Sequence, residues 1–251
     1  MPGPWDKLQQ KIVDTHCHIH HYPEPLHVAK EIQKAGIKVH CVTVKPSEFQ
    51  NCQELFQNFE NIISCLGLFP LNVKEEFKNL GFFLEELKKT SYVGEIGLDY
   101  SVTNEDELKL QREVFSTIVK ECSNQGGKIL SIHSRRSAED VLKAIGCNFN
   151  GTAIMHWFSG EEKLVKGAPE NVFFSINTAM IKSRQGKKIL RALRPQQVLT
   201  ETDGPYVQIN EQPALPSNII NVVNALSCLW DKNLEDTMEI LSGNYLRATS
   251  R

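Results

Sequence analysis

The sequence predicts a (β/α)8 barrel, the TIM-barrel class of α/β folds. Short apolar runs rich in β-branched residues alternate with amphipathic stretches along the whole chain of 251 residues. Eight strand–helix units over this length match a closed barrel in number and in size. The alternative is an open doubly wound sheet, but no G-x-G-x-x-G turn for a dinucleotide follows the first strand. We expect one domain over residues 1–251, because no linker or repeat interrupts the pattern.

The individual elements follow from the spacing of apolar residues. The expected strands are short apolar runs bounded by polar or turn-forming residues, at Ile12–His18, Lys38–Val44, Ile62–Leu68, Tyr92–Leu98, Lys128–His133, Thr152–His156, Val172–Asn177 and Gln197–Asp203. The expected helices have apolar residues at helical spacing, at Pro25–Ala35, Ser47–Phe59, Phe77–Lys89, Glu105–Gln125, Ala138–Ile145, Lys163–Gly167, Ser183–Leu193, Asn218–Trp230 and Leu234–Ala248.

The composition narrows the class of protein. Hydrophobic residues make up 41% and charged residues 23% of the chain, as in ordinary globular proteins. The formal net charge is −2, so a basic surface for nucleic acid must be local. Seven cysteines without a C-x-x-C pair indicate reduced thiols, and Met1–Lys7 lacks a signal-peptide pattern, so we expect a cytoplasmic protein. No apolar run approaches the length that spans a bilayer.

Candidate metal ligands appear first in the segment Asp14–His18, at the end of the first expected strand. Side chains alternate between the two faces of a strand, so His16 and His18 point to the same side. Two neutral imidazoles one pleat apart can chelate one divalent cation. An isolated H-x-H triplet is more often ordinary surface or core histidine, so the prediction depends on ligands from other strands.

Four other expected strands end in further candidate ligands, and they supply Glu95, His133, His156 and Asp203. Each has a simpler explanation alone: a histidine after a strand is commonly a packed residue, and an acid before Gly-Pro commonly forms a turn. In a closed barrel, however, the carboxyl ends of all strands meet at one rim. Buried polar groups brought together there need a shared partner, and the joint pattern predicts a metal site.

The segments that carry these side chains resemble the signature blocks of the TatD family of metal-dependent hydrolases. They occur in the family's order, at Val13–His18, Gly94–Tyr100, Ile132–Arg135, His156–Gly160 and Glu201–Tyr206. The resemblance implies a barrel of the amidohydrolase-like group and a metal-dependent deoxyribonuclease activity. It also implies two divalent cations, the first bound by His16, His18, Glu95 and Asp203 and the second by Glu95, His133 and His156.

The expected chemistry is hydrolysis of phosphodiester bonds in DNA, of exonuclease type, on single strands or DNA ends. Two cations can activate a water molecule and polarise a phosphoryl oxygen together. Asp203 is the candidate for orienting or deprotonating that water, and Glu95 for holding the cations at their spacing. A histidine-rich site suits Zn²⁺ or Mn²⁺, and the family resemblance also permits Mg²⁺.

Other residues near the strand ends are candidates for supporting roles. Arg135 follows a ligand strand directly and is a candidate phosphate contact, while Trp157 and Tyr206 are candidates for stacking on a base. Asp14 and Glu201 are each two residues from a candidate ligand on the same strand, so their side chains point to the same face as the ligands. Each is therefore either a partner for a histidine N–H or a buried structural acid. The remaining histidines are expected not to bind metal, at positions His20, His21, His27 and His40.

Two other functions remain open from the sequence. An amidohydrolase-like enzyme could cleave a small-molecule amide or ester, although such enzymes often bridge their metals with a carboxylated lysine, where this chain offers Glu95. A non-catalytic barrel subunit would have lost ligands, and none of the six is lost. The resemblance extends to TatD-like nucleases of bacterial antiphage loci, which would imply a defence role with partner proteins. No membrane partner is expected.

Overall fold

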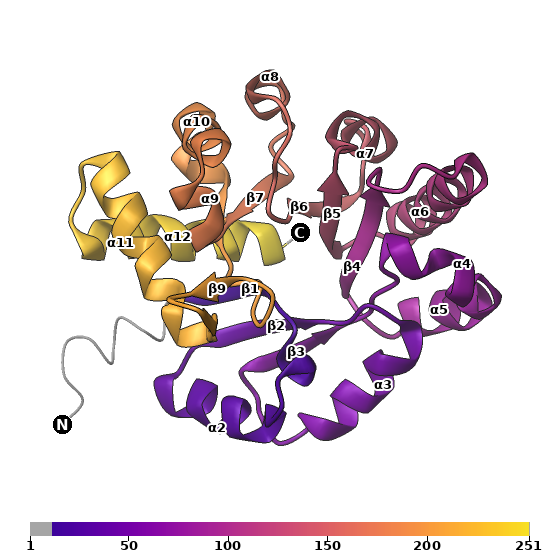
Figure 1. Ribbon diagram of the computed structural model, residues 1–251, viewed down its shortest axis with the longest axis horizontal. Helices are drawn as coiled ribbons and strands as arrows, with labels where there is room; N and C mark the ends of the chain where they lie inside the picture. The colour runs from indigo at the N-terminus through magenta and orange to yellow at the C-terminus, as the bar shows by residue number, and fades with distance from the viewer. Residues whose placement is uncertain (1–11, 251) are drawn as a thin grey trace.

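The computed structural model describes residues 12–250, and it arranges eight parallel strands in a ring with helices outside (Figure 1). The expected barrel is therefore confirmed. The strands are β1 (Val13–Cys17), β2 (Lys38–Val42), β3 (Ile62–Cys65), β4 (Tyr92–Asp99), β5 (Lys128–Arg135), β6 (Gly151–Met155), β7 (Val172–Ile176) and β8 (Val198–Thr200). Six of them end earlier than expected, and β4 and β5 run further.

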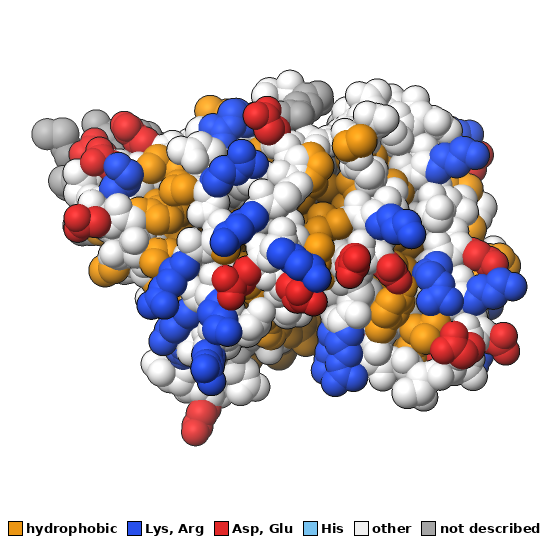
Figure 2. Space-filling view, turned by 90° about the horizontal axis from the view of Figure 1, so that it is seen from above, with side chains coloured by type: hydrophobic (Ala, Val, Ile, Leu, Met, Phe, Trp, Pro, Cys, Tyr) orange, Lys and Arg blue, Asp and Glu red, His pale blue; other side chains and the backbone are white. Residues whose placement is uncertain are grey.

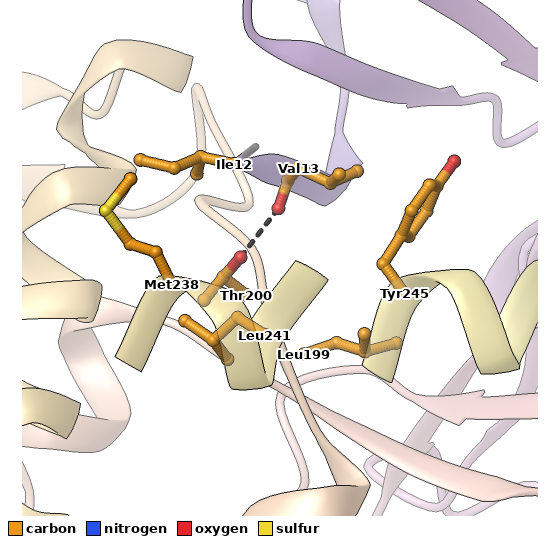
Figure 3. A pocket seen from close by; sticks show the side chains of 7 residues that line it. All are labelled: Ile12, Val13, Leu199, Thr200, Met238, Leu241 and Tyr245. Carbon is orange, nitrogen blue, oxygen red and sulfur yellow. Dashed lines mark hydrogen bonds between the residues drawn. The ribbon is translucent and has the colours of Figure 1, made fainter. Parts of the chain in front are cut away.

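The ring closes at two places where the regular ladder is interrupted. Between β3 and β4, Leu66 and Val93 form one isolated parallel bridge. Between β8 and β1, Thr15 Oγ1 donates a hydrogen bond to the Thr200 carbonyl at 3.0 Å. Thr200 Oγ1 donates in turn to the Val13 carbonyl at 2.6 Å (Figure 3). Side-chain hydroxyls therefore join the first strand to the last.

The α-helices are amphipathic and bury their apolar faces against the strands. Helices α2, α6 and α7 have the bounds expected from the sequence. No helix among residues 12–250 combines the length and apolar character needed to cross a membrane. The helices are α2 (Pro25–Ala35), α3 (Pro46–Leu55), α4 (Val73–Glu76), α5 (Leu80–Leu87), α6 (Glu105–Gln125), α7 (Ala138–Ile145), α8 (Glu162–Lys166), α9 (Thr178–Lys182), α10 (Arg184–Ala192), α11 (Ile219–Trp230) and α12 (Leu234–Thr249).

The helix expected over Phe77–Lys89 is shorter in the structure, where only α5 lies within that range. The structure has a 3₁₀ turn at Phe77–Asn79 between α4 and α5. Phe77 is 49% exposed, so its apolar side chain does not mark a core-facing helical position. A small antiparallel pair, β9 (Gln208–Ile209) and β10 (Gln212–Pro213), was not expected either, because its sequence shows no strand-length apolar run.

Helix α12 covers the end of the barrel at which the strands begin. Tyr245 and Ala248 of α12 pack with apolar strand residues, at Ile129, Ile154, Phe173 and Leu199. The side chain of His40 is also buried beneath this helix, with its Nε2 3.0 Å from the Tyr245 hydroxyl. The carboxyl ends of the strands lie at the opposite rim, because neighbouring strands run parallel.

Candidate metal centre

The structure brings all six predicted ligands together at the carboxyl ends of the strands. His16 lies on β1, Glu95 on β4 and His133 on β5, while His18, His156 and Asp203 lie just beyond strands β1, β6 and β8. Five of them are at most 5% exposed, and His133 is slightly more open. Residues up to 187 positions apart in the sequence therefore share one buried pocket.

The first group of ligand atoms comprises His16 Nε2, His18 Nε2, one oxygen of Glu95 and one of Asp203. The two imidazole nitrogens are 3.3 Å apart. Glu95 Oε2 lies 3.7 Å from His16 Nε2 and 3.5 Å from His18 Nε2. Asp203 Oδ1 lies 3.8 Å and 3.6 Å from the same two atoms. Neighbouring ligands of a tetrahedral zinc ion are about 3.4 Å apart when each lies about 2.1 Å from the metal, so these spacings fit a divalent cation.

The second group uses the other oxygen of the same glutamate. Glu95 Oε1 lies 2.9 Å from His133 Nδ1 and 3.9 Å from His156 Nε2. The three ligand atoms all lie within 4.8 Å of one another. Glu95 thus presents one carboxylate oxygen to each group, which is the arrangement that a bridging ligand between two cations requires.

Local sequence explains how Glu95 reaches this position. The glycines at positions 94 and 97 let β4 approach β5 closely, because a Cβ at Gly97 would overlap the carbonyl oxygen of His133. Gly97 also has a φ of 141°, a backbone conformation that L-residues rarely adopt. The glycines that flank Glu95 are therefore required by the packing of its strand.

Neighbouring side chains orient three of the four imidazoles. His16 Nδ1 lies 2.7 Å from Ser131 Oγ, and His133 Nε2 lies 2.9 Å from Asp99 Oδ2. His156 Nδ1 lies 2.9 Å from Glu201 Oε2. In each case the other ring nitrogen faces the ligand groups, where it would bind a cation, and for His133 and His156 the orienting partner is a carboxylate. For His18, Nδ1 has no hydrogen-bond partner among the residues that the structure describes.

The two buried acids Glu201 and Asp14, which the sequence places on the same strand face as the ligands, have different roles. Glu201 is a histidine partner, and it also accepts hydrogen bonds from the Trp157 backbone N–H and the Asn177 side chain. Asp14 instead accepts hydrogen bonds from the backbone N–H groups of His16 and Thr202, so it is a structural acid.

Sequence reasoning assigned no role to Asp99 and Ser131. Both could have been predicted from the alternation of side chains along a strand. Asp99 is four residues after Glu95 on β4, and Ser131 is two residues before His133 on β5, so each points to the same face as a candidate ligand.

Burial and crowded carboxylates shift the pKa values at this centre. Burial, together with the charges of Glu201 and Glu95, holds the pKa of Asp203 well above its ordinary value. Burial lowers the pKa of His16 and of His18, which favours the neutral imidazole that binds metals. At His156 the nearby carboxylates outweigh burial and raise the pKa to about 10. A cation would relieve the repulsion among these carboxylates, so the electrostatics as well as the spacings fit a bound metal.

The three predicted substrate contacts lie around the rim. Trp157 is 38% exposed and Tyr206 58% exposed, and Arg135 is an exposed residue at the end of β5. A cavity of about 400 Å³ opens beside the second group, lined by His133, Ser134, Arg135, His156, Trp157 and Ser159. Tyr206 lies on the other side of the centre, with its ring centroid 5.0 Å from that of His18. The candidates therefore flank the centre from two sides.

Comparison with known proteins places the chain in a family of metal-dependent hydrolases. The sequence model of the family described as TatD related DNase matches residues 13–250. An uncharacterized metal-dependent hydrolase of Methanocaldococcus jannaschii is 25% identical, over 96% of this chain and 98% of its own. The human deoxyribonuclease TATDN3 is 22% identical, over 94% of this chain and 93% of its own. The crystal structure of the TatD homolog YJJV from Escherichia coli superposes with a TM-score of 0.82 at 20% identity, covering 97% of this chain and 99% of that one, and shows the same fold.

Proposed function

Since the chain belongs to the TatD family of metal-dependent hydrolases, we propose that it is a deoxyribonuclease that uses two divalent cations. The observation that carries this proposal is the position of Glu95, whose two oxygens face two separate sets of imidazoles. His16, His18, Glu95 and Asp203 would hold the first cation, and Glu95, His133 and His156 the second. Mg²⁺, Mn²⁺ and Zn²⁺ are the candidate metals.

Bound divalent cations would supply an acidified water molecule and would polarise a phosphoryl oxygen. The protein's part is to hold the ligands and to accept a proton. Asp203 Oδ1 faces the first group, and Oδ2 makes no hydrogen bond within residues 12–250. The proposed acceptor of the proton of the attacking water is therefore Oδ2 of Asp203.

The rim residues support a nucleic-acid substrate. Arg135 places a cation beside the cavity and suits a phosphate oxygen. Trp157 in the same cavity and Tyr206 across the centre offer aromatic faces to an unpaired base. We therefore propose that the substrate is single-stranded DNA or a DNA end.

The size of the cavity favours attack at a strand end. Figure 2 shows a lateral face of the barrel, on which Lys and Arg side chains are interspersed with Asp and Glu side chains. The cavity of about 400 Å³ has the size of a small-ligand pocket, about 300–1,000 Å³. A pocket of this kind suits one terminal nucleotide better than a long duplex, which supports exonuclease action.

The test is cleavage of end-labelled single-stranded DNA in the presence of Mn²⁺ or Mg²⁺. We expect Asp203→Asn to lose about 10³-fold in turnover, the size of a general-base contribution. Asp106→Asn removes an exposed acid in the first turn of α6 and serves as the matched control, with unchanged turnover expected. Undiminished turnover in Asp203→Asn, or cleavage that persists after chelation of all metal, would contradict the proposed mechanism.

A further inference from the structure

A second cluster of metal-ligating side chains lies beside the metal centre, and it consists of His20, Cys41 and Cys52. His20 lies in the 3₁₀ helix Ile19–His21, Cys41 on β2 and Cys52 on α3. The Nδ1 atom of His20 is 3.6 Å from Cys41 Sγ, and the three ligand atoms all lie within 4.8 Å of one another. The side chain of His20 is 11% exposed, and the two cysteines are 0% and 1% exposed.

Glu48 orients the imidazole of this cluster. Its Oε2 atom lies 3.3 Å from His20 Nε2 and accepts hydrogen bonds from the backbone N–H groups of Val44 and Lys45. A proton on His20 Nε2 is therefore held by the carboxylate, which leaves the lone pair of Nδ1 directed at the thiols. Histidine ligands of metals commonly donate their other N–H to a carboxylate in this way.

We propose that His20, Cys41 and Cys52 form a separate binding site for a thiophilic divalent cation of the Zn²⁺ type. Sulfur and imidazole ligands select such cations over Mg²⁺ or Ca²⁺. A tetrahedral zinc ion with bonds of about 2.3 Å to sulfur and about 2.05 Å to nitrogen separates these two ligand atoms by about 3.6 Å. The observed separation between His20 Nδ1 and Cys41 Sγ is 3.6 Å. Binding would release the two thiol protons to solvent and leave one coordination position for water.

The site differs in chemistry from the metal centre, whose six candidate ligands include no thiol. The ring centroids of His18 and His20 are 6.2 Å apart, so one imidazole belongs to each site. Cys17, between the two histidines of the first motif, directs its thiol to the Gly204 carbonyl instead. The inference therefore does not depend on the proposed nuclease activity.

A competing position for a cation exists on the other side of the same imidazole, among His20, His21 and Glu48. The Glu48 Oε2 atom there already accepts two backbone N–H groups, and His21 Nε2 is 4.0 Å from Glu48 Oε1. That position is also more open, since the side chains of His21 and Glu48 are each 24% exposed. The buried thiol side is therefore the better site for a tightly held cation.

The test is a titration of the reduced, metal-free full-length protein with Co²⁺, which replaces Zn²⁺ and gives a sulfur-to-metal charge-transfer band in the near ultraviolet. We expect one thiolate-bound Co²⁺ per chain in the wild type and in Asp203→Asn. Cys41→Ser and Cys52→Ser should abolish the band. Cys122→Ser removes a fully buried thiol of α6 outside the cluster and should leave the band unchanged.

The wild-type protein decides the question even if a cysteine variant fails to fold. Absence of the band at saturating Co²⁺ would overturn the proposal. An additional bound Co²⁺ without the band would place the cation among His20, His21 and Glu48, and would also overturn it. Glu48→Gln gives a second measurement, with the band retained and the affinity for Co²⁺ reduced about 10- to 100-fold.

Discussion

The replacement Glu201→Gln isolates the contribution of one buried carboxylate to the second cation site. Glu201 is fully buried and accepts hydrogen bonds on both oxygens. Oε1 receives the Trp157 backbone N–H and the Asn177 side chain, and Oε2 receives the Ser175 hydroxyl and faces His156 Nδ1 at 2.9 Å. Glutamine has the same shape, but one of its positions carries a donor instead of an acceptor.

The backbone N–H of Trp157 is fixed and needs an acceptor, so the amide oxygen of the new side chain should occupy the Oε1 position. The amide nitrogen should then occupy the Oε2 position. His156 must then accept a hydrogen bond at Nδ1 and carry its proton at Nε2, the atom that faces Glu95. This tautomer cannot bind a metal through Nε2. Loss of such a partner typically lowers metal affinity about 10- to 100-fold, which equals about 1.4–2.7 kcal/mol.

Calorimetric titration with Mn²⁺ measures this effect directly. We expect the weaker of two binding events to shift by the stated factor while the first remains, and nuclease activity to recover at high Mn²⁺. Glu170→Gln, at an exposed acid before β7, is the matched control. If Glu201→Gln folds normally and binds both cations with wild-type affinity, the tautomer argument is refuted.

Two further predictions concern other parts of the molecule. Burial lowers the pKa of His40 to about 3 from its ordinary 6.5, so the unfolded chain binds the extra proton and stability falls as pH falls between 6.5 and 3. Each unit of pKa shift corresponds to about 1.36 kcal/mol, so the free energy of unfolding of His40→Gln should fall by up to about 5 kcal/mol less over this interval than that of the wild type. Urea unfolding at several pH values measures this difference. Equal losses in the two proteins would show that His40 is not the group responsible. Arg135→Ala should raise KM for single-stranded DNA about 10-fold with little change in kcat, consistent with loss of a charged hydrogen bond of about 1.5 kcal/mol. An unchanged KM would remove Arg135 from substrate binding.

The sequence predicted the barrel because strand and helix periodicities are local properties. The positions of β1 to β8 were found, but their ends were not, since the last residues of several strands turn to present ligands. Asp203 lies three residues beyond β8 with a φ of 52°, a left-handed conformation that strand periodicity cannot predict. The antiphage role, the partner proteins and the cytoplasmic location stay predictions.

The six candidate ligands could be identified because each follows an apolar run at the same rim. Alternation along β4 and β5 places Asp99 and Ser131 on the ligand face, but only the structure shows that they contact His133 and His16. The cluster around His20 could not be predicted, because His20, Cys41 and Cys52 are brought together by the packing of three separate elements. No spacing along the chain indicates that contact.

The join between β8 and β1 has a consequence for how the molecule holds together. Its hydrogen bonds include those of two threonine hydroxyls and the bond from Asp203 N to the His16 carbonyl at 2.9 Å. His16 and Asp203 stand on opposite sides of this seam, and both are candidate ligands of the first cation. A metal ion bound by both residues would cross-link β1 to the segment after β8. Removal of the metal by a chelator should therefore weaken the contact between β1 and β8 before the rest of the barrel.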